Sequence, residues 1–237
     1  MFERDPGVVA RFQGYRLVLN PVGFQAVRDC LPTRWHPLLD EIVVDASAEQ
    51  LVLDPWLTEI GRLGAMRFRT PPRQAAERLA PEVALPDIGA YVRWAMILPP
   101  NGSLEDLTAQ DAVLSRMDGW HPELRALVEQ ADPDNSTLLS IRVVEPGERW
   151  TSGPVTLLGD AIHATSPTGG NGANTALRDA DLLRRRLVEA DEGRRTLLSA
   201  VDDYERQMFE YGAEAVRTSL DRLPAFLDAS TAGEAKG

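Results

Sequence analysis

The hydrophobic and polar positions of the chain follow two different repeats. In the segment 91–98, YVRWAMIL, apolar residues alternate with others, and Val92, Trp94 and Met96 fall on one face, as in a half-buried strand. In the segment 196–220 the apolar residues recur every three or four positions, which is typical of a helix. Because both repeats occur, the chain is predicted to be an α/β or α+β protein.

The same patterns predict the remaining elements. Further strands are expected at 15–19, 41–45, 49–54, 137–144 and 155–158, and further helices after Pro21, at 74–79, 108–117 and 122–131, and from Ala173 onward. The apolar stripe of the helix at 196–220 could form a coiled-coil seam. It is short and contains two tyrosines, so we expect a single helix that packs on its own domain. The small, polar residues 229–237 predict a disordered tail.

Composition narrows the class of protein. A chain of 237 residues with 43% hydrophobic residues can form one domain or two small ones with a real core. Its net charge of −11 argues against nucleic acid and anionic membranes as partners. Cys30 is the only cysteine, which excludes a disulfide framework and a multi-cysteine metal site. No apolar run has membrane-spanning length and no signal-peptide core follows the start, so a cytoplasmic location is predicted.

The densest group of candidate functional residues lies between 153 and 188. An apolar run at 155–158 is followed by a loop rich in Gly, Pro, Ser, Thr and Asn, and then by a helix. Gly170 and Gly172 have no Cβ, which lets backbone N–H groups approach a ligand. The helix N-terminus behind them carries unpaired N–H donors and partial positive charge. This pattern predicts a site for an anionic or carbonyl-rich group, such as a phosphate or a flavin oxygen.

Asp160 and His163 are the polar side chains best placed to touch that ligand. Each also has a simpler explanation, because Asp is common in turns and a histidine often satisfies a local hydrogen bond. The pair could hold a metal ion only with further ligands nearby. The other histidines, His36 and His121, each precede a proline and lack further candidate ligands nearby in the sequence, so no metal is predicted.

Residues 159–183, GDAIHATSPTGGNGANTALRDADLL, resemble the C-terminal flavin motif of the class A flavoprotein monooxygenases, the family of para-hydroxybenzoate hydroxylase. That motif reads roughly G-D-A-x-H, three residues, P-x-x-G-x-G-x-N, and later D-A-x-x-L, and every fixed position is present here. The resemblance implies FAD, with Asp160 on the ribityl chain and the loop 167–174 against the isoalloxazine ring. The cofactor-binding residues it implies in this segment are Gly159, Asp160, Pro167, Gly170, Gly172, Ala173 and Asn174.

Two parts of the family pattern differ from this chain. The start, FERD, resembles the position where an acidic residue holds the adenosine ribose, which would give Glu3 and Arg4 a role in FAD binding. An ordinary charged terminus is the alternative. The sequence has no G-x-G-x-x-G, so the first strand, phosphate loop and first helix of a Rossmann unit are expected to be missing. The family's central Asp-Gly motif also has no counterpart, because Asp118-Gly119 reads as a turn.

The resemblance implies a partial FAD-binding Rossmann-like domain, a reduced substrate-domain β-sheet and C-terminal helices. The expected division is a partial FAD-binding domain at 1–35, a reduced substrate-binding domain at 36–150, the FAD-binding strand–loop–helix at 151–190, and C-terminal helices with a tail at 191–237. The implied function is hydroxylation of an aromatic or polyketide-like small molecule with FAD, NAD(P)H and O2. The alternative is a non-catalytic, truncated remnant that binds FAD weakly or not at all.

Overall fold

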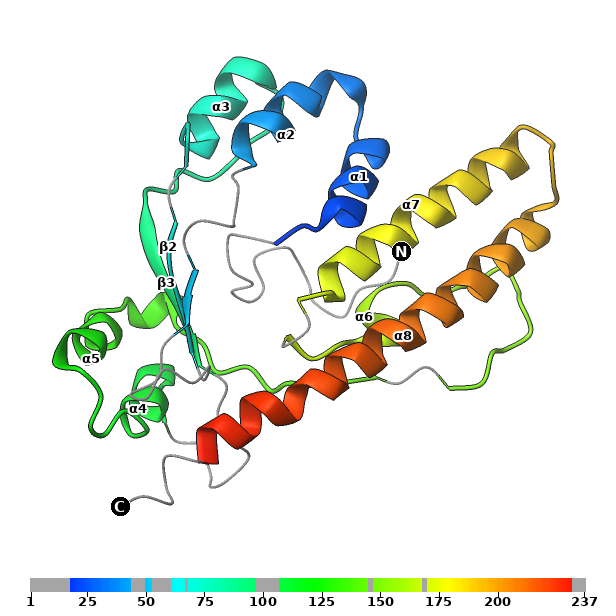
Figure 1. The fold of residues 1–237 in the computed structure, drawn as a ribbon. Coiled ribbons are helices and arrows are strands. Elements are labelled where there is room, and N and C mark those ends of the chain that lie inside the picture. The colour runs from blue at the N-terminus through cyan, green and yellow to red at the C-terminus, as the bar shows by residue number, and fades with distance from the viewer. Residues whose placement is uncertain are drawn as a thin grey trace.

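The computed structural model is mostly helical and has one small sheet (Figure 1). It describes residues 18–43, 50–52, 61–66, 68–96, 107–144, 147–167 and 170–231, with 50–52, 61–66 and 225–231 as backbone alone. The helices are α1 (Pro21–Cys30), α2 (His36–Ile42), α3 (Pro72–Leu79), α4 (Ala109–Leu114), α5 (Pro122–Glu129), α6 (Asp160–His163), α7 (Gly172–Asp191) and α8 (Leu197–Thr231). The strands are β1 (Gln50–Val52), β2 (Gly61–Met66) and β3 (Tyr91–Met96).

Helices α7 and α8 form an antiparallel pair, and α1 packs on the opposite side of α7 from α8 (Figure 1). The apolar stripe of α8 meets α6 and α7 in a buried cluster of Ile162, Leu182, Tyr204, Met208 and Tyr211. The stripe therefore packs within its own domain, which confirms the single-helix interpretation. The helix continues past the predicted end to Thr231, so the first residues of the expected tail are helical.

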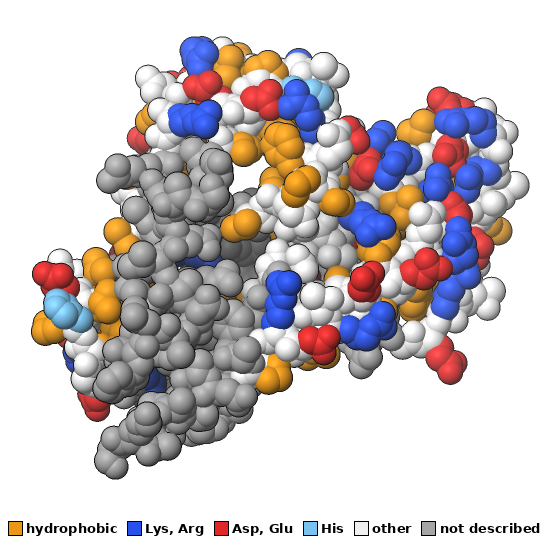
Figure 2. Space-filling view, in the orientation of Figure 1, with side chains coloured by type: hydrophobic (Ala, Val, Ile, Leu, Met, Phe, Trp, Pro, Cys, Tyr) orange, Lys and Arg blue, Asp and Glu red, His pale blue; other side chains and the backbone are white. Residues whose placement is uncertain are grey.

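Charged residues join α7 to α8 near the turn between them, where side chains of both signs are interspersed on the surface (Figure 2). Asp203 of α8 lies 2.5 Å from Nε of Arg186 on α7 and 3.5 Å from Nη1 of Arg195. Burial by itself raises the pKa of the Asp203 carboxyl, but the hydrogen bond from Arg206 and the charges of the arginines outweigh burial and lower that pKa. Asp203 therefore stays ionised and holds the helical hairpin together.

Asn174, in the first turn of α7, holds the segment that leads into α1. Its Oδ1 accepts a hydrogen bond from the Asn20 N–H at 2.9 Å, and its Nδ2 donates to the carbonyls of Val18 at 2.9 Å and Gly170 at 3.1 Å. The approach is so close that a Cβ on Gly23 would lie 2.1 Å from the Asn174 Oδ1. Glycine at position 23 is therefore required for α1 to dock on α7.

The sheet is antiparallel, with the strand order β1-β2-β3. Leu51 stands opposite Leu63, and Leu63 opposite Trp94. Helices α4 and α5 pack against β3 in a cluster that includes Trp94, Met96, Val113, Met117 and Val128. A separate cluster, around Leu38, Ala75 and Ala76, joins α2 to α3.

The strand predicted at 41–45 is wrong in its described part, because Glu41 and Ile42 complete α2 and Val43 caps that helix. The spacing of Leu38, Leu39 and Ile42 is helical, and the helix buries both leucines. The β-branched residues Ile42 and Val43 favoured a strand by propensity alone, which tertiary packing overrides. Residues 44 and 45 lie outside the described part of the chain.

The other strand predictions have mixed outcomes. The strands expected at 49–54 and 91–98 are confirmed at 50–52 and 91–96, and β2 was not predicted. The strands expected at 137–144 and 155–158 are wrong, because both segments are irregular. Of the strand expected at 15–19, only Val18 and Leu19 are described, and both are irregular as well. A strand needs a partner for its ladder of hydrogen bonds. None of these segments pairs with another strand among the residues that the structure describes.

We predict that Asn174→Ala lowers the free energy of unfolding by about 1–3 kcal/mol, because it leaves the Asn20 N–H and the Val18 carbonyl without their partner. The measurement is urea unfolding followed by far-UV circular dichroism. Asn171→Ala is the matched control, since the Asn171 side chain makes no capping hydrogen bond at the same helix end. An equal loss in both variants would contradict this role of Asn174.

Candidate functional site

The flavin-motif residues lie in α6, in the loop after it, and at the start of α7. Gly159, just before α6, has φ of +61°, a conformation that favours glycine. A Cβ at this position would also lie 3.2 Å from the Ala176 Cβ on α7. The Gly159 N–H donates to Oδ2 of Asp179 at 2.7 Å. Gly159 therefore fixes α6 against α7.

The Asp179 carboxylate is the buried centre of this region. Besides the Gly159 N–H, its Oδ2 is bonded to Nε2 of His163 at 2.7 Å, and its Oδ1 accepts a hydrogen bond from the Tyr211 hydroxyl at 2.5 Å. Asp179, His163 and Tyr211 are all buried. The carboxylate thus joins α6, α7 and α8 in one network.

The network also sets the protonation of its members. Burial by itself lowers the pKa of the His163 imidazole, but the hydrogen bond to Asp179 and the Asp179 charge outweigh burial and raise that pKa. Burial and the same charge raise the pKa of the Tyr211 hydroxyl far above its ordinary value, so it stays protonated and donates its hydrogen bond to Asp179. His163 is buried and bonded to Asp179, so its Nε2 braces α6 against α7.

Asp160 has a different environment from His163, although both belong to α6. Its side chain is exposed, and within the described residues its carboxylate has no hydrogen-bonded or ionic partner. A free carboxylate beside the motif loop can accept hydrogen bonds from the hydroxyl groups of a ligand. Asp160 therefore remains the best side-chain candidate for ligand binding.

The start of α7 supplies backbone donors. Asn171 precedes the helix without a side-chain capping bond, so the Asn171 side chain leaves the first N–H groups of α7, those of Gly172, Ala173 and Asn174, uncapped. These donors and the helix dipole favour an anionic or carbonyl oxygen. A Cβ on Gly172 would lie 2.8 Å from Oγ1 of Thr165, so this glycine is also needed for packing.

The remaining predicted residues divide into three groups. Gly170 has φ of +63° and open space around it, and Pro167 is exposed, which leaves both accessible to a ligand. The side chain of Asn174 is committed to the backbone, so only its N–H stays available. Glu3 and Arg4 lie outside the described residues.

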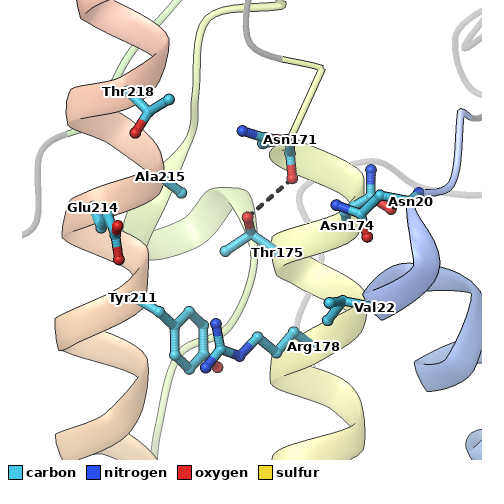
Figure 3. A pocket seen from close by; sticks show the side chains of 10 residues that line it. All are labelled: Asn20, Val22, Asn171, Asn174, Thr175, Arg178, Tyr211, Glu214, Ala215 and Thr218. Carbon is cyan, nitrogen blue, oxygen red and sulfur yellow. Dashed lines mark hydrogen bonds between the residues drawn. The ribbon is translucent and has the colours of Figure 1, made fainter.

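A pocket of about 230 Å³ opens between the starts of α1 and α7 and the middle of α8 (Figure 3). Its lining residues are Asn20, Val22, Asn171, Asn174, Thr175, Arg178, Tyr211, Glu214, Ala215 and Thr218. The Arg178 guanidinium lies over the Tyr211 ring, 3.8 Å from the ring centroid, which is a cation–π contact. The pairing of Arg178 on α7 with Tyr211 on α8 could not be predicted from the sequence, because the fold alone brings these two helices together.

The part of the chain that the structure describes contains no group of three or more His, Cys, Asp or Glu side chains that could hold a metal ion. None of its helices is both long enough and apolar enough to cross a membrane.

We predict that Asp179→Asn lowers the pKa of His163, because the substitution removes the charge that raises it. In the native chain the raised pKa of His163 contributes to the stability of the fold. This contribution is fully present below about pH 6.5, the ordinary pKa of histidine, and is lost as the pH rises through the pKa of His163 in the folded state. The measurements are the NMR titration of the His163 ring and the pH dependence of unfolding. Asp181→Asn, on the same helix but paired with Arg184 and Arg185, is the control. An unchanged titration in Asp179→Asn would contradict the coupling.

Comparison with known proteins identifies the motif region. The model of the FAD binding domain family matches residues 130–219, which include α6, α7 and most of α8. The chain is 34% identical over 189 residues to the dual O-methyltransferase/FAD-dependent monooxygenase CTB3 of Cercospora beticola, covering 73% of this chain and 19% of CTB3. It is 38% identical over 109 residues to the FAD-dependent urate hydroxylase of Klebsiella oxytoca, covering 46% of this chain and 27% of that enzyme.

A solved structure is also similar. An FAD-containing monooxygenase from Photorhabdus luminescens subsp. laumondii matches with 36% sequence identity and a TM-score of 0.53, covering 73% of this chain and 44% of that one. The chain therefore spans less than half of the length of each of these relatives. The motif region of the chain, residues 130–219, is therefore similar to the FAD-binding region of FAD-dependent monooxygenases.

Proposed function

We propose that this chain provides the flavin-ring side of the site in an FAD-dependent hydroxylase that uses NAD(P)H and O2. The observation that carries the proposal is the uncapped start of α7 beside the free carboxylate of Asp160. The two features supply donors for the carbonyl edge of a flavin and an acceptor for its ribityl hydroxyls. Both are held in place by the buried Asp179 network.

The residues present fit FAD on chemical grounds. The N–H groups of Gly172 and Ala173 would donate to the N1 and O2 edge of the ring, and Asp160 would accept from the ribityl chain. Gly170 and Pro167 would lie against the ring, and Glu3 and Arg4 would lie near the adenosine. FAD, when bound, supplies the transfer of electrons from the nicotinamide to oxygen. The protein's part is to orient the ring and to favour negative charge at its edge.

The names of two relatives support a proposal for the substrate class. The name of the Klebsiella relative states that it hydroxylates urate, a small nitrogen heterocycle, and CTB3 is named a monooxygenase. We propose an aromatic or polyketide-like small molecule as the substrate of the complete site. The test is NADH or NADPH consumption by the FAD-loaded protein with a panel of phenols, urate and quinones, together with detection of a hydroxylated product.

A second candidate function is weak FAD binding without catalysis. The pocket at the start of α7 measures about 230 Å³, below the roughly 300–1,000 Å³ of typical cofactor sites, so it can enclose only part of FAD. This candidate predicts loose retention of FAD. Stoichiometric FAD that survives gel filtration would exclude it.

We predict that Asp160→Ala weakens FAD binding by roughly tenfold to a hundredfold, which corresponds to the loss of a charged acceptor of about 1.5–3 kcal/mol. His163→Ala should change the stability of the protein more than its intrinsic affinity for FAD, because His163 is a buried brace. Titration calorimetry with FAD measures the affinity of each variant and shows which substitution weakens binding more. Asp191→Ala, an exposed aspartate at the far end of α7, is the control. A larger affinity loss in a folded His163→Ala would reverse the assignment.

We predict that Gly172→Ala abolishes the rise in melting temperature that FAD gives the native chain, because a Cβ would stand between the flavin and the N–H groups of α7. The same Cβ would contact Oγ1 of Thr165. The double variant Gly172→Ala/Thr165→Ala relieves that contact, so it should regain stability without regaining the FAD effect. Melting curves with and without FAD make the comparison. If the double variant recovered the thermal shift, Gly172 would serve packing alone.

A further inference from the structure

Helices α7 and α8 each turn one face toward the pocket between them, and the two faces have the same spacing. The lining residues run from Asn171 to Arg178 on α7 and from Tyr211 to Thr218 on α8, at helical intervals of three and four. Because the faces have equal length, they form a groove about 10 Å long, which we call the interhelix groove. Its volume of about 230 Å³ lies below the roughly 300–1,000 Å³ of sites for drug-sized ligands, so it suits a smaller molecule.

Hydrogen bonds hold the base of the interhelix groove in place. The side chain of Tyr211 is buried, and its hydroxyl donates to the Asp179 carboxylate at 2.5 Å. Thr175 is also buried, and its hydroxyl donates to the Asn171 carbonyl at 2.9 Å. A groove whose base is already fixed has little conformational freedom to lose when a ligand binds, which favours affinity.

Arg178 and Glu214 bring opposite charges to this groove. Arg178 reaches from α7 toward α8, and the face of its guanidinium lies on the Tyr211 ring, so the N–H groups at the guanidinium edge can still donate (Figure 3). Glu214 follows Tyr211 by three residues and lies on the same face of α8, about one helical turn away. Among the residues that the structure describes, neither charged side chain has an ion-pair or hydrogen-bond partner.

We propose that the interhelix groove binds a small zwitterion of the amino-acid class. Its carboxylate accepts two parallel hydrogen bonds from the guanidinium of Arg178, and its ammonium group donates to the carboxylate of Glu214. A short apolar side chain contacts Val22 and Ala215, which also line the groove. A ligand with a single charge would leave one of the two charged side chains without a partner.

The groove uses different groups from those proposed for the flavin. The flavin contacts are backbone N–H groups at the start of α7 and the exposed Asp160, whereas the groove uses side chains on the flanks of α7 and α8. The proposal therefore stands independently of FAD binding, and its test uses the chain without FAD.

The test compares free leucine with two analogues that each lack one of its charged groups. Isocaproate keeps the carboxylate without the ammonium group, and isoamylamine keeps the ammonium group without the carboxylate. NMR titration of the backbone amides at neutral pH measures the affinity and locates the site. For leucine we expect saturable shifts at 171–178 and 211–218 with a Kd of about 1 mM or below, and for each analogue binding at least about tenfold weaker.

Substitutions assign the two charges. Arg178→Gln and Glu214→Gln each remove one charge and keep a polar side chain, so each should weaken leucine binding by about tenfold or more. The matched controls are Arg217→Gln and Glu210→Gln, because both residues are exposed on α8 and do not line the groove. Arg178 and Glu214 are exposed as well, so the helical circular dichroism of all four variants should stay that of the native chain.

Three outcomes would overturn the proposal. The first is the absence of saturable shifts on both helix faces up to about 10 mM leucine, tenfold above the expected Kd. The second is equal affinity for leucine and isocaproate, which would indicate a simple anion site at Arg178. The third is leucine binding that Glu214→Gln leaves unchanged, since the ammonium group would then bind elsewhere.

Discussion

The buried carboxylate of Asp179 is the constraint on which the candidate site depends. A charge removed from water must be paired or hydrogen-bonded, or it destabilises the fold by several kcal/mol. Asp179 meets this requirement with a backbone N–H before α6, a ring nitrogen on α6 and a hydroxyl on α8. These partners come from two distant parts of the chain, the α6 segment and α8. The position of α6, and with it the direction of the exposed Asp160, is therefore fixed by electrostatics as much as by apolar packing.

Asn174 has the corresponding role at the other end of the motif. Its side-chain amide forms hydrogen bonds with the backbone before α1. These bonds place α1 beside the start of α7, where it forms one wall of the pocket. The motif thus combines two kinds of residue. Gly159, Asp179 and Asn174 hold the scaffold, while Asp160 and the first N–H groups of α7 face outward and remain available. Although the motif as a whole indicates ligand binding, these three residues of it make structural contacts within the fold.

The elements that could be predicted from sequence are those that local interactions determine. The helices at 72–79, 122–129 and 172–191 carry their own periodicity, and α1 and α5 carry a proline at the first turn. Strands depend on partners that are distant in sequence, which explains why 137–144 and 155–158 were predicted and are irregular. The motif residues were located from the spacing of GDAIH and the glycines. The cation–π pair of Arg178 and Tyr211 could not be predicted from the sequence, because it depends on how α7 and α8 pack.

The segment 155–158 leads directly into the candidate site. Leu158 ends an exposed apolar segment, and the next residue, Gly159, donates to Asp179. Leu157 is tied to Tyr204, which shares the buried cluster of α8 with Tyr211. These two bonds hold the backbone that leads into α6 and so reduce the conformational freedom that flavin binding must otherwise remove. Flavin binding and the order of this backbone should therefore each strengthen the other, since coupling between two sites is reciprocal.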